Sequence, residues 1–231
     1  EIASSINDKS RINTINLLEV PNQTFLEAIQ IDSPASESIK RRLLSLKKSK
    51  NLNLSFESIA THDVANSIDN ITGQRKCKWL VLEWDGRENS GIFIGNPVGW
   101  LLKNVNSSLA LFKDNGVRSF SRILIALRPG RRNQKFIDIA DKICFHYGAS
   151  LTLLNIISEN QQESVSLKKT SEELLSLTKS KSELKIIKSN DPVETISEES
   201  ASYDLLILGT PEKDNWIRVL FSASEDKFVK M

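Results

Sequence analysis

The chain has 231 residues, of which 39% are hydrophobic and 26% charged, and its formal net charge at pH 7 is +2. This composition is typical of a soluble globular protein with one large domain or two domains of ordinary size. So small a net charge argues against a nucleic-acid-binding protein and against a polybasic membrane clamp. The two cysteines, Cys77 and Cys144, form no CxxC pair, which predicts free thiols in a reducing compartment.

The first half of the chain predicts strands that alternate with helices. The expected strands are Ile12–Val20, Leu52–Ile59, Trp79–Trp84 and Ser108–Phe112, and the expected helices are Ser33–Lys50, Val64–Ile71 and Gly95–Val105. The run Trp79–Trp84 is nearly continuous in apolar residues, with Glu83 as the exception, rather than alternating, so we expect a central strand that is covered on both faces. Thr61 or Asp63 is expected to cap the helix that starts at Val64.

The helix Ser33–Lys50 is amphipathic, and Ser36 is its expected cap. Its apolar stripe consists of Ile39, Leu43, Leu44 and Leu46. Its opposite face carries Lys40, Arg41, Lys47 and Lys48. Such a charged face is explained either by solvation or by an anionic partner.

The second half repeats the alternation. The expected strands are Arg122–Leu127, Leu151–Ile157, Leu184–Lys188 and Tyr203–Leu208, and the expected helices are Asn133–Tyr147, Ser164–Lys179 and Ile217–Val229, with one more after Pro192. Gly148 is expected to cap the end of the first of these helices. Pro192 suits the first turn of a helix, where its missing N–H group costs nothing.

The order of elements therefore occurs twice, which predicts two copies of one folding unit, residues 1–116 and 117–231, with a turn at Asp114–Gly116 between them. Strands that alternate with helices of this length predict an α/β fold with two doubly wound parallel sheets. Copy one has a last strand that copy two lacks, and copy two has an opening strand that copy one lacks. This pattern indicates that the chain is a piece of a longer protein.

Several segments of copy two carry a family resemblance. RILIAL at 122–127, followed by a helix and by GASLTLLNI at 148–156, resembles the opening of a universal stress protein domain. NDPVETI at 190–196 resembles the third strand-to-helix junction of that family, and YDLLILGT at 203–210 its fourth strand. The resemblance implies tandem domains of the adenine nucleotide alpha hydrolase-like fold over nearly the whole chain.

Copy one narrows the resemblance. VPNQTFLEA at 20–28, ATHDVANSI at 60–68 and WLVLEWDG at 79–86 look like the tandem stress-protein modules that follow the membrane domain of amino-acid permease superfamily transporters. Similar modules follow some cation/proton antiporters, cation-chloride cotransporters and chloride channels. The resemblance therefore implies a cytosolic regulatory part of a transporter, located on the cytoplasmic side of the cell membrane.

The ATP-binding branch of the family carries a Gly-x2-Gly-x9-Gly-Ser/Thr loop after the fourth strand, where backbone N–H groups and a helix N-terminus hold phosphates. In copy one this region contains Gly86, Gly91, Gly95 and Asn96. Gly95 and Asn96 match the final Gly-Ser/Thr pair of this loop, with Asn in place of the hydroxyl residue. The spacing of Gly86 and Gly91 differs from that of the first two glycines in the family loop. The loop is either a degenerate nucleotide site, with ATP or another adenine nucleotide as its ligand, or a set of ordinary turn glycines.

In copy two only Gly209 remains of that loop, and the bulky Trp216 and Phe221 leave little room for a triphosphate. The acidic residue that the family places at the end of the first strand is replaced by Leu127. Arg128, Arg131 and Arg132 follow at the carboxyl end of this strand, where open α/β sheets bind ligands. These arginines are either anion contacts, for a nucleotide or a cyclic dinucleotide, or part of a solvated loop.

No catalytic motif is present: HExxH, CxxC, GxSxG and P-loop patterns are all missing, as are clusters with metal-ligand spacing. His62 is expected to cap a helix start beside Asp63, although such a pair also suits proton transfer. His146 falls in the last turn of a helix, where the dipole favours a cation. We therefore expect a protein that is not an enzyme, and a weak nucleotide hydrolase is the enzymatic alternative.

Taken together, these features predict a non-catalytic regulatory module that acts on its own transporter domain. It is expected to form a homodimer through its sheet edges and to bind no nucleic acid. The alternative is a free-standing tandem universal stress protein that binds ATP or AMP.

Overall fold

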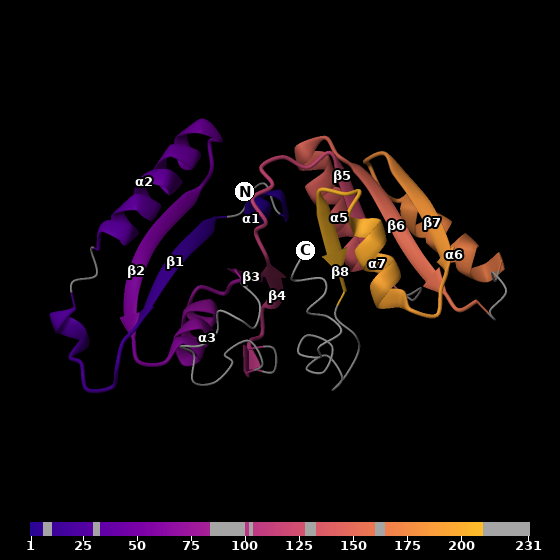
Figure 1. Ribbon diagram of the computed structural model, residues 1–231. Helices are drawn as coiled ribbons and strands as arrows, with labels where there is room; N and C mark the ends of the chain where they lie inside the picture. Colours follow the sequence, from indigo (N-terminus) through magenta and orange to yellow (C-terminus); the bar gives the residue numbers. More distant parts are fainter. Residues whose placement is uncertain are drawn as a thin grey trace.

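A computed structural model describes the fold for residues 1–6, 11–29, 33–83, 100–101, 104–127, 133–159 and 165–209. Strands and helices alternate along these segments, and neighbouring strands pair in parallel (Figure 1). The predicted α/β fold with parallel sheets is therefore confirmed. None of the described helices combines the length and the apolar character that are needed to cross a bilayer.

The elements follow the predicted order. Copy one holds α1 (Ile2–Ile6), β1 (Ile12–Glu19), the 3₁₀ turn η1 (Leu26–Ala28), α2 (Pro34–Ser49), β2 (Leu54–Thr61), α3 (Val64–Gln74), β3 (Trp79–Glu83) and β4 (Ser108–Phe112). Copy two holds β5 (Arg122–Ala126), α5 (Asn133–Tyr147), β6 (Ser150–Ile157), α6 (Val165–Ser176), β7 (Ser182–Lys188), α7 (Pro192–Ser200) and β8 (Leu205–Leu208). The division of the chain at residue 116 stays a prediction.

The sheet of copy two has the strand order β7-β6-β5-β8. The chain runs outward from β5 through β6 to β7 and then returns to the other side of β5 as β8, which is the order of a doubly wound fold. Ile123, Leu124 and Ile125 of β5 are completely buried, because strands and helices cover both faces of this central strand. Ile123 and Ile125 belong to one apolar core with Ile137 and Ala140 of α5.

Copy one follows the same order but has no strand at its centre among the described residues. It forms two separate pairs, β1 with β2 and β3 with β4. In the order of elements, β1 corresponds to β6 of copy two and β3 corresponds to β8. In copy two, the strand β5 lies between β6 and β8. The consequence shows in burial: β6 is almost entirely buried, whereas β1 is half-buried along its length.

The prediction that Trp79–Trp84 is covered on both faces is therefore wrong for the described part of that run. β3 is half-buried and pairs with β4 alone among the described residues. An unbroken apolar run indicates a strand that could be buried, but the tertiary structure decides whether neighbours cover it. Trp84 itself lies outside the described residues.

The edge of β1 that pairs with no described strand can be identified from its hydrogen bonds. The Ile12 amide donates to the Asn53 carbonyl at 2.8 Å, and the Val20 amide donates to the Thr61 carbonyl at 2.9 Å. Because backbone N–H groups alternate in direction along a strand, the amides of the even-numbered residues from Ile12 to Val20 point toward β2. The odd-numbered residues, such as Ile15 and Leu17, therefore point their amides toward the side where no described strand lies.

Local capping chemistry determines where several helices begin and end. Asp63 accepts a hydrogen bond from the Asn66 amide at 3.0 Å, and Asp191 accepts one from the Glu194 amide at the same distance. Pro192 occupies the first turn of α7, as predicted. Gly148 ends α5 at a φ of +67°, a backbone conformation that suits glycine.

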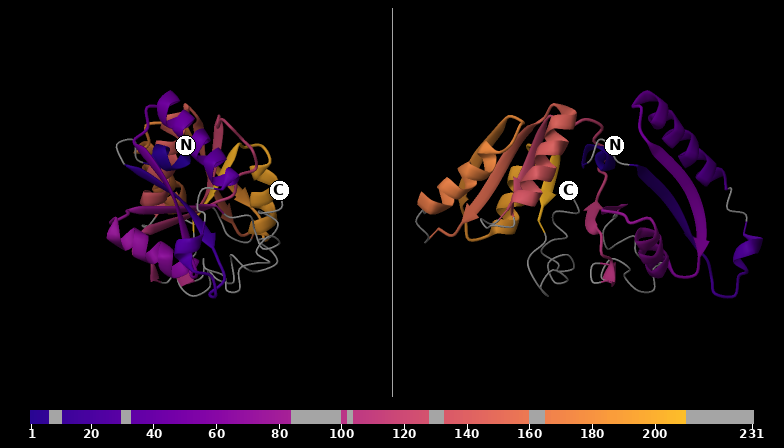
Figure 2. Two further views of the ribbon diagram at one scale, coloured as in Figure 1. Left: turned by 90° about the vertical axis from the view of Figure 1, so that its left-hand side faces the viewer. Right: turned by 180° about the vertical axis from the view of Figure 1, so that it is seen from behind.

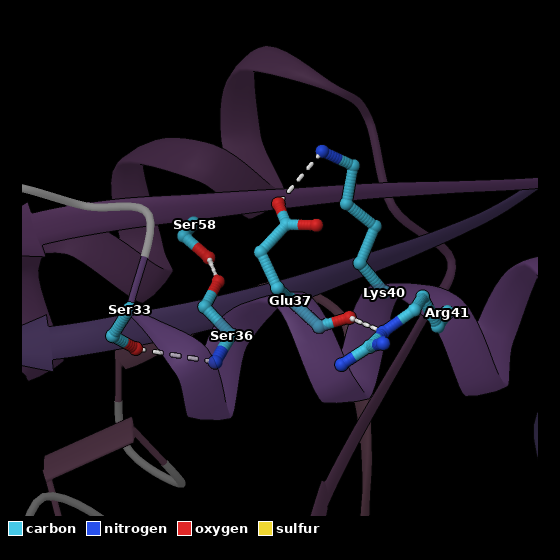
Figure 3. A network of polar contacts seen from close by, with 6 residues as sticks. All are labelled: Ser33, Ser36, Glu37, Lys40, Arg41 and Ser58. Carbon is cyan, nitrogen blue, oxygen red and sulfur yellow. Dashed lines mark hydrogen bonds and ion pairs between the residues drawn. The ribbon is translucent and has the colours of Figure 1, made fainter.

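The cap and the apolar stripe predicted for the second helix are corrected. Ser33 is the N-cap of α2 and accepts from the Ser36 amide at 3.1 Å, while the buried Ser36 hydroxyl bonds to the Ser58 hydroxyl of β2 at 2.6 Å (Figure 3). Within the predicted stripe, Ile39 and Leu44 are exposed. The period of apolar residues identified the helix correctly but not the side that packs.

The helix α1 lies against copy two rather than beside β1. It contacts α5, and Ile2 packs on the apolar core of copy two, while Ile6 is only 6% exposed (Figure 1). The Tyr147 ring at the end of α5 lies edge-on to Phe120 with ring centroids 4.7 Å apart. Burial, followed by the nearby Glu1 carboxylate, raises the pKa of Tyr147 to about 12.

Other differences concern the ends of elements. The helix predicted at Ser164–Lys179 is described as α6 and ends at Ser176, so Leu177 follows the helix and is 61% exposed. The strand predicted at Leu52–Ile59 is displaced by two residues in β2. The helix predicted at Ile217–Val229 and most of the one predicted at Gly95–Val105 lie outside the described residues.

Candidate functional site

The residues predicted for ligand binding lie outside the described part of the chain. These are Gly86, Gly91, Gly95 and Asn96 in copy one, and Arg128, Arg131 and Arg132 in copy two, together with the bulky Trp216 and Phe221. Their proposed roles remain predictions. The described residues that bear on a site are therefore those at the carboxyl ends of the strands, where open α/β sheets bind ligands.

The change of chain direction in copy two falls between β5 and β8, and apolar side chains meet there among the described residues. Leu127, directly after β5, is 9% exposed. A Cβ atom added to Gly209, directly after β8, would lie 3.0 Å from Leu127 Cδ2 and 3.6 Å from Phe136 Cζ. The glycine therefore allows the close approach of these side chains, and the described part of this position offers an apolar contact rather than a polar crevice.

The loops that follow β6 and β7 are joined by Asn190. Its Oδ1 atom accepts from the Ser158 hydroxyl at 3.0 Å, and its amide nitrogen donates to Glu159 Oε2 at 3.0 Å. Asp191, the next residue, caps α7. These contacts hold the two loops together at the carboxyl edge of the sheet.

The corresponding loops of copy one are joined by His62, which stands in the place of Asn190. Its Nδ1 atom lies 3.1 Å from the Val20 carbonyl oxygen at the end of β1, so the ring links the end of β1 to the loop after β2. The cap of α3 is Asp63 instead of His62, which corrects the predicted role of the histidine. Two hydrogen bonds from Asn66, chiefly the one from its backbone N–H and then the one from its side-chain amide, hold the pKa of Asp63 below its usual range.

Sequence reasoning did not find the link made by His62 and Asn190. The usable signal was positional, because each residue directly precedes an N-cap aspartate in its copy, and only a comparison of the two copies places them in register. In both copies the side chain before the cap contacts the loop after the neighbouring strand. The polar groups described at this edge thus bond to one another and hold the loops.

The two cysteines and the second histidine, His146, lie elsewhere. Both cysteines are free, as predicted, and burial raises the pKa of the Cys144 thiol to about 12, with a further contribution from Asp141. His146 lies in the last turn of α5 and its ring is 4.9 Å from that of Tyr147, centroid to centroid. These groups do not lie at the carboxyl edge of the described strands.

Two further features bear on binding. The described residues include no group of three or more His, Cys, Asp or Glu side chains able to hold a metal ion. A shallow, open hollow of about 620 Å³ lies between α6 and the first part of β7. It is lined by Lys168, Glu172, Leu175, Ser176, Ser182, Glu183, Leu184 and Ile186. Its walls mix charged and apolar groups and hold no arrangement typical of a catalytic centre.

The whole chain resembles solved structures. A universal stress protein from Archaeoglobus fulgidus DSM 4304 superposes with a TM-score of 0.64 and 14% identity, over 100% of this chain and 87% of that one. The chain has the fold of a universal stress protein. A putative universal stress protein from Pseudomonas aeruginosa UCBPP-PA14 superposes with a TM-score of 0.56 and 11% identity, over 95% and 90% of the two chains.

A protein of unknown function from Pseudomonas aeruginosa PAO1 superposes with a TM-score of 0.55 and 12% identity, over 98% and 90% of the two chains. No model of a known protein family and no curated protein matches the sequence. Because these identities lie between 11% and 14%, the likeness is one of fold. The ligand and the biological role have to be argued from this chain's own residues.

Proposed function

We propose that the chain is a non-catalytic regulatory module of a membrane transporter of the amino-acid permease superfamily. The observation that carries the non-catalytic part is the packing of Leu127 and Phe136 against Gly209, because it puts hydrocarbon where a doubly wound sheet usually holds its ligand. The transporter part is supported by the three segments of copy one that resemble the modules behind such transporters.

In this proposal copy two has a mainly structural role, and any ligand binds copy one. The predicted loop around Gly95 belongs to copy one, and a nucleotide-like anion fits the backbone N–H groups that glycines expose. A ligand that binds one conformation of the module more tightly than another shifts the balance between them, and with it the state of the attached membrane domain.

The sequence encoded upstream of Glu1 tests the transporter part. Repeated apolar segments of about 20 residues each would support it, since each is long enough to span a bilayer. An initiating methionine just before Glu1, with no such segments, would sink it and favour the free-standing stress protein.

Calorimetry tests the ligand part. The chain is titrated with ATP, AMP and cyclic dinucleotides at a protein concentration that detects a Kd of about 100 μM. Gly95→Trp is expected to abolish the heat of binding, whereas Gly73→Trp is the matched control, because an added Cβ at Gly73 meets no atom within 4 Å. Absence of heat with every nucleotide would remove the ligand from the proposal, and equal binding by both variants would show that another loop binds it.

A further inference from the structure

One leucine of α2 is exposed among cations. Leu44 is 46% exposed. The residues four and three positions before it are Lys40 and Arg41, and those three and four positions after it are Lys47 and Lys48. Because residues three and four apart are neighbours on a helix surface, cations surround Leu44 along the helix on both sides. We call these five residues the α2 patch.

The α2 patch concentrates the positive charge of the molecule. Within Pro34–Ser49, five residues are basic and one, Glu37, is acidic. The whole chain has 31 basic and 29 acidic residues, so the remainder of the chain carries two more acidic than basic side chains. The net charge of +2 therefore hides a cationic helix on an otherwise slightly acidic protein. The net charge, which argued against membrane binding, does not take this local asymmetry into account.

Contacts with β2 hold α2 in one orientation. The Ser36 and Ser58 hydroxyls bond at 2.6 Å, and Lys47 Nζ donates to the Leu54 carbonyl at 2.9 Å. The single acidic residue is engaged within the helix: Glu37 Oε1 lies 3.0 Å from Lys40 Nζ, and its carbonyl accepts from Arg41 Nε at 3.4 Å (Figure 3). Two views show α2 at one outer side of the molecule, with α6 and β7 at the opposite side (Figures 1 and 2).

We propose that the α2 patch binds an anionic phospholipid surface, with Leu44 in the headgroup region and the cations on lipid phosphates. An apolar side chain flanked by lysine and arginine on an amphipathic helix is the arrangement that adsorbs to such surfaces. The shape favours lipid over a peptide, since a single outer helix is convex and the hollow between α6 and β7 has no lining residue from α2. The inference rests on α2 alone and holds whether or not a transporter domain precedes the chain.

Vesicle flotation tests this proposal with the chain as it is. The chain should float with vesicles of phosphatidylcholine mixed with phosphatidylserine at low ionic strength, and should stay unbound with phosphatidylcholine alone. Arg41→Gln with Lys48→Gln should lower the partition coefficient about 25-fold, as each cation contributes about five-fold. These two positions are chosen because Lys40 pairs with Glu37 and Lys47 donates to β2, whereas Arg41 makes only a 3.4 Å bond to a carbonyl of its own helix.

The matched control is Lys168→Gln with Lys169→Gln on α6, which removes the same charge from another exposed helix and should change binding less than about two-fold. Leu44→Ala should weaken binding about three- to five-fold, because it removes half-exposed hydrocarbon from the contact. Circular dichroism confirms that each variant is folded.

Three outcomes would overturn the proposal. Failure of the unmodified chain to float with anionic vesicles at low ionic strength excludes the lipid surface. Equal losses for the α2 and α6 charge variants show an unspecific effect of total charge. Unchanged binding by Leu44→Ala, with weaker binding by the α2 charge variant, assigns the patch to a purely electrostatic partner such as an acidic protein. A missing upstream membrane domain would refute the proposed function and leave this result standing.

Discussion

Replacing Asp141 should destabilise copy two more than replacing any exposed carboxylate. Asp141 belongs to α5 and is only 9% exposed. Its Oδ1 atom accepts from the Lys179 amide at 3.1 Å and from the Ser180 amide at 2.9 Å, and its Oδ2 atom accepts from the Lys179 amide at 3.0 Å. One side chain thus anchors the turn between α6 and β7 to α5.

The magnitude follows from the number of donors. Asp141→Ala leaves two backbone N–H groups without their charged acceptor, and a hydrogen bond to a charged group contributes about 1.5–3 kcal/mol. Lys179 is exposed and Ser180 half-buried, so water restores part of the loss. We expect the free energy of unfolding to fall by about 3 kcal/mol for Asp141→Ala. Asp141→Asn keeps one acceptor oxygen and should lose about half of that.

Urea denaturation followed by circular dichroism measures these changes as free energies of unfolding. Asp138→Ala and Asp138→Asn are the matched controls, since Asp138 lies one turn earlier on α5 and is exposed. Both should stay within about 0.5 kcal/mol of the unmodified chain. A loss below about 1 kcal/mol for Asp141→Ala, or an equal loss for Asp138→Ala, would refute the assignment of the carboxylate as an anchor.

The Asp204 carboxylate accepts from the Ser121 amide at 2.7 Å and from the Arg122 amide at 2.9 Å, which lowers its pKa. The contribution of this carboxylate to the free energy of unfolding is therefore full above the pKa of the unfolded state and is lost as the pH falls through the lower folded pKa. The difference in unfolding free energy between the unmodified chain and Asp204→Asn should accordingly shrink below about pH 4. A difference that does not change with pH would contradict this. In hydrogen exchange, the Ile15 amide should exchange faster than the Asn16 amide, and equal protection would show that β1 is paired on both sides. A thiol reagent should modify the half-buried Cys77 in the native state and reach the buried Cys144 only on unfolding, so equal rates would exclude the described packing of α5.

The accuracy of sequence reasoning varied with the distance over which each feature is decided. The helix Asn133–Tyr147 was predicted with its observed bounds, because its apolar period and Gly148 are local to the chain. The cap of α2 was misplaced by three residues, since Ser36 bonds to Ser58, a residue 22 positions away. Both serines suit a cap, and only the position of β2 decides between Ser33 and Ser36.

The candidate site shows the same division. The resemblance to universal stress proteins implied that Leu127 stands where that family carries an acidic residue, but it did not indicate what the leucine contacts. The structure places it beside Gly209, a residue 82 positions later, where an added Cβ atom would lie 3.0 Å from Leu127 Cδ2, so a side chain at Gly209 would require Leu127 to shift. The roles predicted for Gly86, Gly91, Gly95 and Asn96, and for Arg128 and Arg131, fall outside the described residues and await the binding experiments.

By itself the sequence determined the order of strands and helices, some of the caps, such as Gly148, and the parallel α/β class, since these follow from period, capping chemistry and crossover length. Tertiary structure alone decided that β5 is buried while β3 is half-buried, that His62 bonds to the end of β1, and that Leu44 faces outward among cations. The physical reason is that burial depends on which distant segments cover a residue, whereas local conformation depends on its nearest neighbours along the chain.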